Sequence, residues 1–236
     1  MTNCSTVTIS GTAADAGGGV VAGIEVSIDG GATWHPAIGG ASWVYNWTPK
    51  ASGMVTIKSR AVDDNGNLEA PLAGVNVTGV NAPTLPCPSV GSSQDTGDSN
   101  YMTGSQVTVG AQPVTVTALS AYVGAVDPTA ANRRYSVAIY SDSNGAPGSL
   151  VATSAAGTLT ANAWNTLAVN ATLAANTSYW LMYNANGSSA NYDNLAYDTA
   201  ATNVGAWAPQ SFGAWPASFN GATVTNQRYS LYATVS

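Results

Sequence analysis

The lack of any helical repeat is the feature that most constrains how this chain folds. Over its 236 residues, no stretch repeats apolar side chains at i, i+3, i+4 and i+7, the spacing of an amphipathic helix. Short runs rich in Val, Thr and Tyr recur instead, separated by Gly, Asn, Pro and Asp. Residues 24–28, 43–47 and 55–62 alternate apolar and polar side chains, as a strand with one buried face does. The sequence therefore predicts an all-β protein.

A proline-rich segment divides the chain into two predicted β-sandwich domains. Residues 81–90 contain three prolines, which favours an extended, semi-rigid linker. Residues 1–80 hold about seven short strands at the spacing of an immunoglobulin-like sandwich. Residues 91–236 hold about eight or nine strand candidates, which is typical of a larger, jelly-roll-like sandwich.

Alternation also predicts which faces of the second domain are buried. In the strand around 135–140, Tyr135, Val137 and Ile139 should face the core, with Ser136 and Tyr140 on the other sheet surface. Near the C-terminus, four alternate residues should face inward: Tyr229, Leu231, Ala233 and Val235.

Three stretches of the first domain carry a resemblance. They are IEVSIDGGATWHPA at 24–37, WVYNWTP at 43–49 and IKSRAVDDNGNLE at 57–69. Together they resemble bacterial Ig-like and fibronectin-III-like modules, and they are similar to the Ig-like dimerisation domain of sulfite oxidase-type enzymes. The resemblance implies an Ig-like fold and a spacer role, because such modules mostly separate other domains.

One long run of the second domain carries another resemblance. IYSDSNGAPGSLVATSAAGTLTANAWNTLAVNATLAANTSYWLMYN, at 139–184, is similar to extracellular bacterial β-sandwich domains. These occur as modules beside glycoside hydrolases, as carbohydrate-binding modules do, or as cell-surface "choice-of-anchor" domains. The resemblance implies a multimodular, extracellular bacterial protein. The matching residues look structural, so they do not name a ligand.

The charge balance excludes several partners. The net charge is −6, and the chain has only six Lys and Arg, too few to neutralise a nucleic-acid backbone or to bind an anionic membrane surface. No window approaches the roughly 20 apolar residues of a membrane span, so membrane insertion is not expected either.

We expect an extracellular or cell-surface location. The residues after Met1 lack the basic start and apolar centre of a signal peptide. Sparse charge with abundant Thr, Ser, Asn and Gly is nevertheless typical of secreted bacterial surface proteins. We therefore expect Met1 to begin an excised piece of a longer protein.

Cys4 and Cys87 are the two cysteines of the chain, and they bracket the first domain. A disulfide between them would suit a secreted protein. The first and last strands of a seven-stranded sandwich, however, usually lie at opposite ends, beyond the ~7 Å Cα separation that a disulfide allows. The sequence leaves the pairing open.

Catalysis is not expected. The acids of the second domain are Asp95, Asp98, Asp127, Asp142, Asp193 and Asp198. A pair of them could in principle hydrolyse glycosides, but several sit in turns, and the one histidine, His35, lies in the first domain. No nucleophile site accompanies that histidine.

One short segment suggests a metal ion. Asp95, Asp98 and Asn100 place oxygen donors at i, i+3 and i+5, which would suit a loop around a structural Ca²⁺. The alternative, which the sequence slightly favours, is a solvated turn in which Asp and Asn bond to their own backbone.

The segment from Asn184 to Asn220 combines large rings with Asn, Asp, Gly and Ser and contains no Lys or Arg. Rings beside amides and carboxylates suit sugars, whose C–H faces stack while their hydroxyls accept and donate hydrogen bonds. Phe212 and Phe219 lack a polar group and are expected in the core. The predicted ligand-binding residues are Trp207, Trp215, Tyr192, Tyr197, Asn184, Asn191, Asp193, Gln210 and Arg228.

The sequence thus predicts a non-catalytic module that binds a polysaccharide or oligosaccharide. The rival interpretation is a structural or adhesive surface protein, an anchor or a self-associating fibre subunit, whose exposed rings are buried against another chain. Whether the site is a flat platform or a cleft depends on whether Trp207 and Trp215 are coplanar.

Overall fold

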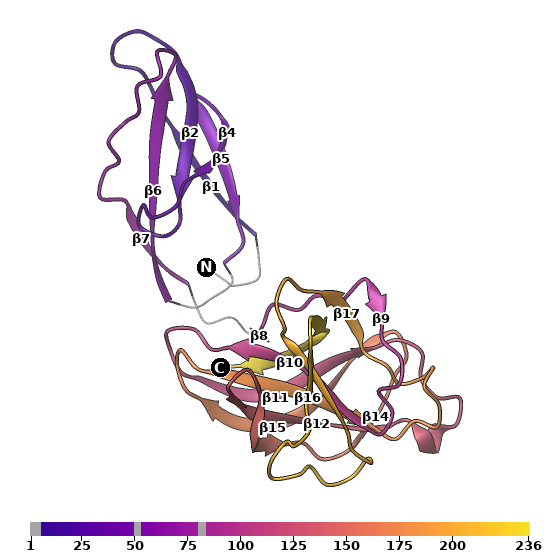
Figure 1. Ribbon diagram of the computed structural model, residues 1–236. Helices are drawn as coiled ribbons and strands as arrows, with labels where there is room; N and C mark the ends of the chain where they lie inside the picture. Colours follow the sequence, from indigo (N-terminus) through magenta and orange to yellow (C-terminus); the bar gives the residue numbers. More distant parts are fainter. Residues whose placement is uncertain (1–5, 50–52, 80–83) are drawn as a thin grey trace. The chain divides into compact units, whose positions relative to one another are not determined.

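The computed structural model describes residues 6–49, 53–79 and 84–236, and the chain forms two compact units, Met1–Ala82 and Pro83–Ser236. Strands make up both units (Figure 1). In the described residues the single helical element is a 3₁₀ turn, η1 (Ala130–Asn132). The all-β prediction is therefore confirmed. No helix among the described residues has the length and apolar character needed to cross a membrane.

The first unit contains two small antiparallel sheets. Their strand orders are β1-β5-β4 and β3-β2-β6-β7. The bounds are β1 (Val7–Thr12), β2 (Val21–Ser27), β3 (His35–Pro36), β4 (Ile38–Gly39), β5 (Ser42–Trp47), β6 (Gly53–Asp63) and β7 (Val75–Gly79). The core is small: in the described residues its one buried cluster consists of Ile24, Val26 and Trp43, with partly buried side chains such as Ile9 and Ile57 packed against it.

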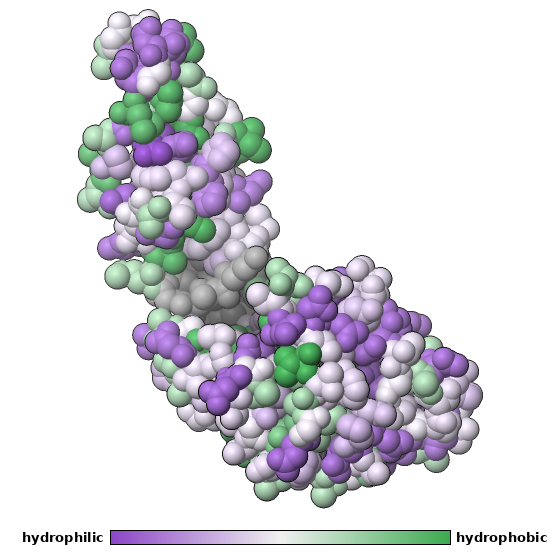
Figure 2. All heavy atoms as spheres, viewed as in Figure 1, coloured by the Kyte–Doolittle hydropathy of each residue, from purple (hydrophilic) through white to green (hydrophobic). Residues whose placement is uncertain are grey.

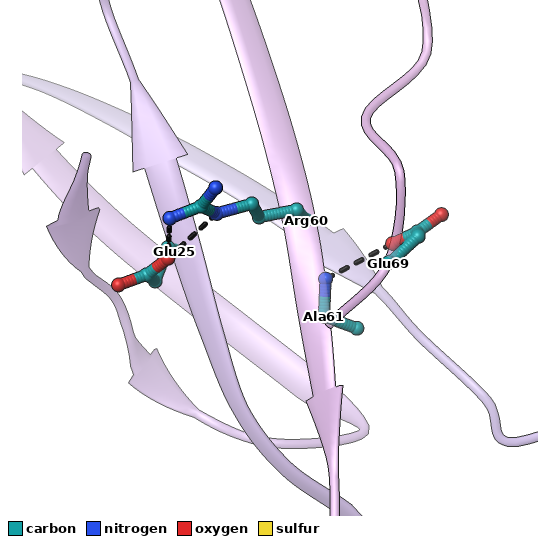
Figure 3. Close-up of polar contacts among 4 residues, drawn as sticks. All are labelled: Glu25, Arg60, Ala61 and Glu69. Atoms are coloured by element: carbon teal, nitrogen blue, oxygen red, sulfur yellow. Dashed lines mark hydrogen bonds and ion pairs between the residues drawn. The ribbon is translucent and has the colours of Figure 1, made fainter. Parts of the chain in front are cut away.

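Polar contacts add to this small core (Figure 3). The Arg60 guanidinium donates from Nε to Glu25 Oε2 at 2.6 Å and lies 4.1 Å from the centre of the Trp34 ring. The Glu69 carboxylate accepts the Ala61 N–H at 3.0 Å and so ties the segment before β7 to β6. Such partly exposed contacts are each worth about 1 kcal/mol or less.

The second unit is built from three sheets. The large sheet has the order β13-β12-β16-β10-β18-β19, with β14 also paired to β12; the others are β15-β11-β21-β8 and β20-β17-β9. The bounds are β8 (Thr84–Leu85), β9 (Ser93–Gln94), β10 (Tyr101–Thr108), β11 (Val114–Val123), β12 (Arg134–Ser143), β13 (Ala146–Thr153), β14 (Gly157–Thr158), β15 (Ala163–Leu173), β16 (Ser178–Ala185), β17 (Ala196–Thr199), β18 (Gly205–Pro209), β19 (Thr223–Thr225), β20 (Gln227–Tyr229) and β21 (Leu231–Val235).

The main core lies between the large sheet and the four-stranded sheet. Val137 and Leu181 of the large sheet and Leu119 and Ala233 of the four-stranded sheet belong to one buried cluster. The inward faces predicted from alternation are confirmed, because all seven residues are buried: Tyr135, Val137, Ile139, Tyr229, Leu231, Ala233 and Val235.

The outer face of the large sheet is also buried. Residues 210–222, which we call the covering loop, cross it and enclose a second apolar cluster that includes Tyr140, Trp180 and Phe219. The loop is held by backbone bonds from Phe219 to Gly148 (2.8 Å) and from Leu150 to Ala217 (2.9 Å). Tyr140 therefore lies on the predicted face, but that face is not open to solvent.

The segment between the domains differs from the expected linker. Thr84 and Leu85 form β8 and pair with Thr234 and Ala233 of β21, so this part of the predicted linker 81–90 belongs to a sheet of the second unit. Cys87 is not a free thiol. Cys4, whose pairing with Cys87 the sequence leaves open, lies outside the described residues.

Candidate functional site

A pocket of about 560 Å³ lies in the second unit, lined by residues of both the large sheet and the three-stranded sheet. Four segments that are distant in sequence line it: residues 95–101 with Thr103, residues 187–190, Trp207 of β18, and Gln227 with Tyr229 of β20. We call this the β10–β18 pocket. It combines two aromatic side chains of the large sheet with carboxyl, amide and hydroxyl groups.

Strand alternation explains why the pocket residues point the same way. Thr103 of β10 lies opposite Trp207 of β18 in the antiparallel ladder, and directly opposed residues share a face. Tyr101 is two residues before Thr103, so it also shares that face. Met102, between them, points to the other side and joins the second apolar cluster.

Tyr101 and Trp207 form an aromatic corner in this pocket. Their ring centres are 5.8 Å apart and their planes meet at 68°, an edge-to-face contact. Trp207 is only half-buried, so part of its ring remains available to a ligand. The corner is rigid because both residues belong to paired strands.

Asp98 forms a buried part of the pocket wall. It is 3% exposed, and its Oδ2 accepts the Leu195 N–H at 2.8 Å, while its own N–H donates to Asn194 Oδ1 at 2.9 Å. Burial, helped by the nearby Asp95 carboxylate, raises the pKa of Asp98 to about 7. Burial, again with these two carboxylates, also raises the pKa of Tyr229.

Thr103 brings an unsatisfied oxygen to the same wall. Its side chain is 1% exposed, and Oγ1 has no hydrogen-bond partner. The hydroxyl is near enough to Asp98 to oppose the rise in the pKa of that carboxyl, although the two groups do not reach hydrogen-bond geometry. A buried hydroxyl without a partner is rare and often marks a place for a ligand or water.

The three residues of the predicted calcium loop, Asp95, Asp98 and Asn100, all line this pocket, but they make different contacts. Asn100 has a positive φ of 61°, and its Oδ1 accepts the Phe212 N–H at 3.1 Å. It therefore holds the start of the covering loop. Among the described residues no group of three or more acidic, His or Cys side chains could hold a metal ion.

Trp215 lies on the opposite face of the large sheet from Trp207. Its Nε1 donates to Ser136 Oγ at 3.1 Å, and its ring centre is 6.1 Å from that of Tyr140. It thus anchors the covering loop to the second apolar cluster. The two tryptophans cannot form one coplanar platform, because the sheet separates them.

The other predicted ligand-binding residues do not line the β10–β18 pocket. The Asn184 amide donates to Tyr101 O and Gln210 O, both at 2.9 Å. Gln210 donates to two carbonyl groups within its own loop. Asp193 is fully buried, and its Oδ1 accepts the Asp127 N–H at 3.0 Å. These three side chains hold loops together.

The four remaining predicted residues also lie elsewhere. Tyr197 is half-buried against the main core, and Tyr192 is partly buried and offers its carbonyl to the Ser99 hydroxyl at 3.3 Å. Asn191 is exposed. Arg228 lies opposite Asp198 in the β17–β20 ladder and helps to lower the pKa of that carboxyl, after the larger effect of the Ser92 hydrogen bonds.

The pocket residues that sequence reasoning missed include Tyr101 as a partner of Trp207, Thr103, Gln227 and Tyr229. The run from Tyr101 to Thr108 reads as an ordinary strand, and the pairing of Thr103 with Trp207 spans more than a hundred residues. One signal was available, since Tyr101 directly follows the cluster Asp95, Asp98 and Asn100.

Comparison with known proteins gives a weak likeness. No family model and no curated protein matches the chain. One solved structure aligns with a TM-score of 0.26 and 9% sequence identity, covering 77% of this chain and 91% of that chain. It comes from a study titled "Structural basis for the promiscuous specificity of the carbohydrate-binding modules from the beta-sandwich super family". A TM-score this low assigns neither a family nor a ligand to this chain.

Proposed function

We propose that the second unit binds a polysaccharide or oligosaccharide without catalysis, and that the β10–β18 pocket is the binding site. The observation that carries this proposal is the half-buried Trp207 on a rigid strand beside polar groups that line the same pocket. A pyranose ring would lie against Trp207 and Tyr101, a contact worth roughly 1–3 kcal/mol of apolar burial. Its hydroxyls would bond to Asp95, Gln227 and neighbouring groups.

The polar wall fits a binding role better than hydrolysis. Asp98 already accepts the Leu195 N–H, and no Lys, Arg or His lines the pocket to position a second acid or a base. A site that only binds needs no such partner. We therefore propose a module of modest affinity within a multimodular extracellular bacterial protein, in which repetition or a neighbouring catalytic module would raise the avidity.

Isothermal titration calorimetry against a panel of soluble polysaccharides tests the proposal. Trp207→Ala should weaken binding at least about tenfold, since it removes most of the stacking surface. Trp215→Ala is the matched control, because it deletes the same side chain on the other face of the sheet. If no glycan binds the parent, or if Trp207→Ala binds normally, the proposal is wrong.

A structural or adhesive role is a second candidate, and the first unit supplies the observation for it. Ile38, Met54, Leu72 and Val75 are each more than half exposed there, and Figure 2 shows apolar (green) side chains on the surface of this unit. Such side chains could bury against another chain. Light scattering over a wide concentration range separates the two roles: growing oligomers favour assembly, and a constant monomer mass favours glycan binding.

A further inference from the structure

The β10–β18 pocket holds two carboxyl groups and no basic side chain. Asp95 and Asp98 line it, and Lys, Arg and His are absent from the lining. In the described part of the chain the one ion pair, between Arg60 and Glu25, belongs to the first unit. A buried carboxylate without a cationic partner is costly. The pocket would therefore gain more from a positively charged ligand group than from a neutral one.

The Thr103 hydroxyl is a second and independent sign of a ligand group at this wall. Its oxygen is buried, lines the pocket and has no partner. It lies close enough to Asp98 to affect that carboxyl. A ligand that donates hydrogen bonds would satisfy Thr103 Oγ1 and add a charged partner to the Asp98 carboxylate, whose Oδ2 accepts the Leu195 N–H; a ligand without donors would leave Thr103 Oγ1 unpaired.

The aromatic residues of the pocket also favour a cation. Tyr101 and Trp207 meet edge to face, and Tyr229 also lines the pocket. A cation over the face of an aromatic ring is attracted by about 0.5–2 kcal/mol, the larger value applying where water is excluded. The carboxylates and the aromatic rings thus both favour a positively charged ligand group.

The number of oxygens decides between a metal ion and an ammonium group. A calcium ion takes six to eight oxygens, more than the two carboxyl groups and the unpartnered Thr103 hydroxyl supply, and the Asn100 amide oxygen is already bonded to the Phe212 N–H. A primary ammonium group carries three N–H donors. Three acceptors, namely Asp95, Asp98 and Thr103, match these three donors.

We propose that the preferred ligand is a carbohydrate that carries a protonated primary amine, that is, an amino sugar. This inference rests on the proposed carbohydrate function and specifies its substrate class. The ammonium group lies at Asp95, Asp98 and Thr103, and the sugar ring lies against Trp207 and Tyr101. Binding involves no covalent step.

Calorimetry with three β-1,4-linked tetramers of equal length tests the inference: one of glucosamine, one of N-acetylglucosamine and one of glucose. The intact chain should bind the glucosamine tetramer at least about tenfold more tightly than the other two, because only that tetramer supplies the charged donor. The readout is this ratio of dissociation constants, which a general loss of binding would not change.

Three variants test whether Asp98 and Thr103 cause the preference for the glucosamine tetramer. Asp98→Asn removes the charge, and Thr103→Val removes the hydroxyl while keeping the side-chain shape; each should lower the ratio to about threefold or less. Asp198→Asn is the matched control, because it makes the same change of charge at a carboxyl bonded to Ser92 outside the pocket. Its ratio should equal that of the parent. Circular dichroism checks that each variant is folded, and Thr103→Val still tests the inference if Asp98→Asn is not.

The outcomes separate this inference from the proposed function. If the glucose tetramer binds as tightly as the glucosamine tetramer, the amine inference is overturned and the carbohydrate function stands. If none of the tetramers and no other glycan binds, both are wrong. If millimolar CaCl₂ raises the unfolding temperature of the parent, but not of Asp98→Asn, and abolishes the preference for the amine, the pocket is a calcium site and the inference is overturned.

Discussion

Trp207 and Trp215 follow the same two residues, Gly and Ala, yet the fold gives them opposite surroundings. Trp207 lies on the inner face of the large sheet and lines an open pocket, whereas Trp215 lies against the outer face and is bonded to Ser136. Their immediate neighbours in sequence are nearly identical, so the difference arises from strand pairing. Trp207 is paired in β18, and Trp215 belongs to a loop that strands β12 and β13 hold in place.

The largest expected effect is on the stability of the second unit. It comes from a change in β10 that should disturb the surroundings of Trp207 and of Trp215 together. Gly104 lies in β10, and a Cβ atom there would overlap the Leu181 carbonyl oxygen of β16. Gly104→Ala should therefore destabilise the second unit by more than about 3 kcal/mol, as hydrogen exchange resolved by unit would show. Gly23→Ala is the control, because nothing lies within 4 Å of its added methyl group. Parent-like stability of Gly104→Ala would contradict the β10–β16 pairing.

The next effect concerns the pocket side alone and depends on pH. The pKa of Asp98 is raised from 3.8 to about 7, so the folded state binds more protons than the unfolded state between these values. Stability should then fall as pH rises from about 4 to about 7, by at most about 4 kcal/mol. Asp98→Asn should flatten this dependence in urea unfolding curves. An unchanged slope in the variant would mean that Asp98 is not the group responsible.

The third test compares the two tryptophans directly. Trp215→Ala should destabilise the second unit by about 2 kcal/mol, less than for a fully buried ring because Trp215 is only half-buried. Carbohydrate affinity should change by less than about twofold. Trp207→Ala should do the reverse, with a large loss of affinity and a small loss of stability. If the two variants lost equal stability, or equal carbohydrate affinity, the proposed difference between the two faces of the large sheet would be wrong.

The smallest effect concerns how the covering loop is held. The Tyr140 hydroxyl donates to Pro216 O at 2.7 Å. Tyr140→Phe removes this bond, keeps the ring contact with Phe219, and should cost about 1 kcal/mol. Faster hydrogen exchange at the Phe219 amide, with no change in the dissociation constant for a bound glycan, is the expected result. No change in exchange would show that other contacts suffice to hold the loop.

Strand content and burial on the inner faces followed from the sequence because both depend on local alternation. Tyr135, Val137 and Ile139 are buried as predicted, and Phe219 is buried as well. The rule for alternation assigns a side chain to a face. It does not say what covers that face, and Tyr140 became buried because a loop some seventy residues later crosses it.

The pocket could be predicted only in pieces. Trp207 and the group Asp95, Asp98 and Asn100 stood out in the sequence, but as two separate sites for a sugar and for calcium. The structure places Trp207 and this group in one pocket. The reason is that β10 pairs with β18, and the loop before β10 is hydrogen-bonded to the Leu195 backbone. Asn184 and Gln210 looked equally suited to bind sugars; their amides bond to backbone carbonyls instead, a choice that composition does not reveal.

The β10–β18 pocket is made of two kinds of wall, and the difference bears on how such a site changes over evolution. Tyr101, Thr103, Trp207 and Tyr229 stand on paired strands, where an insertion would shift the register of the ladder. Residues 95–100 and 187–190 lie outside the named strands, in connections of the kind that vary most in length and composition among related proteins. On the proposed function, exchange of these two loops would change the preferred ligand while Tyr101, Trp207 and Tyr229 stay in place, and loop libraries at the same positions offer the engineer the same freedom.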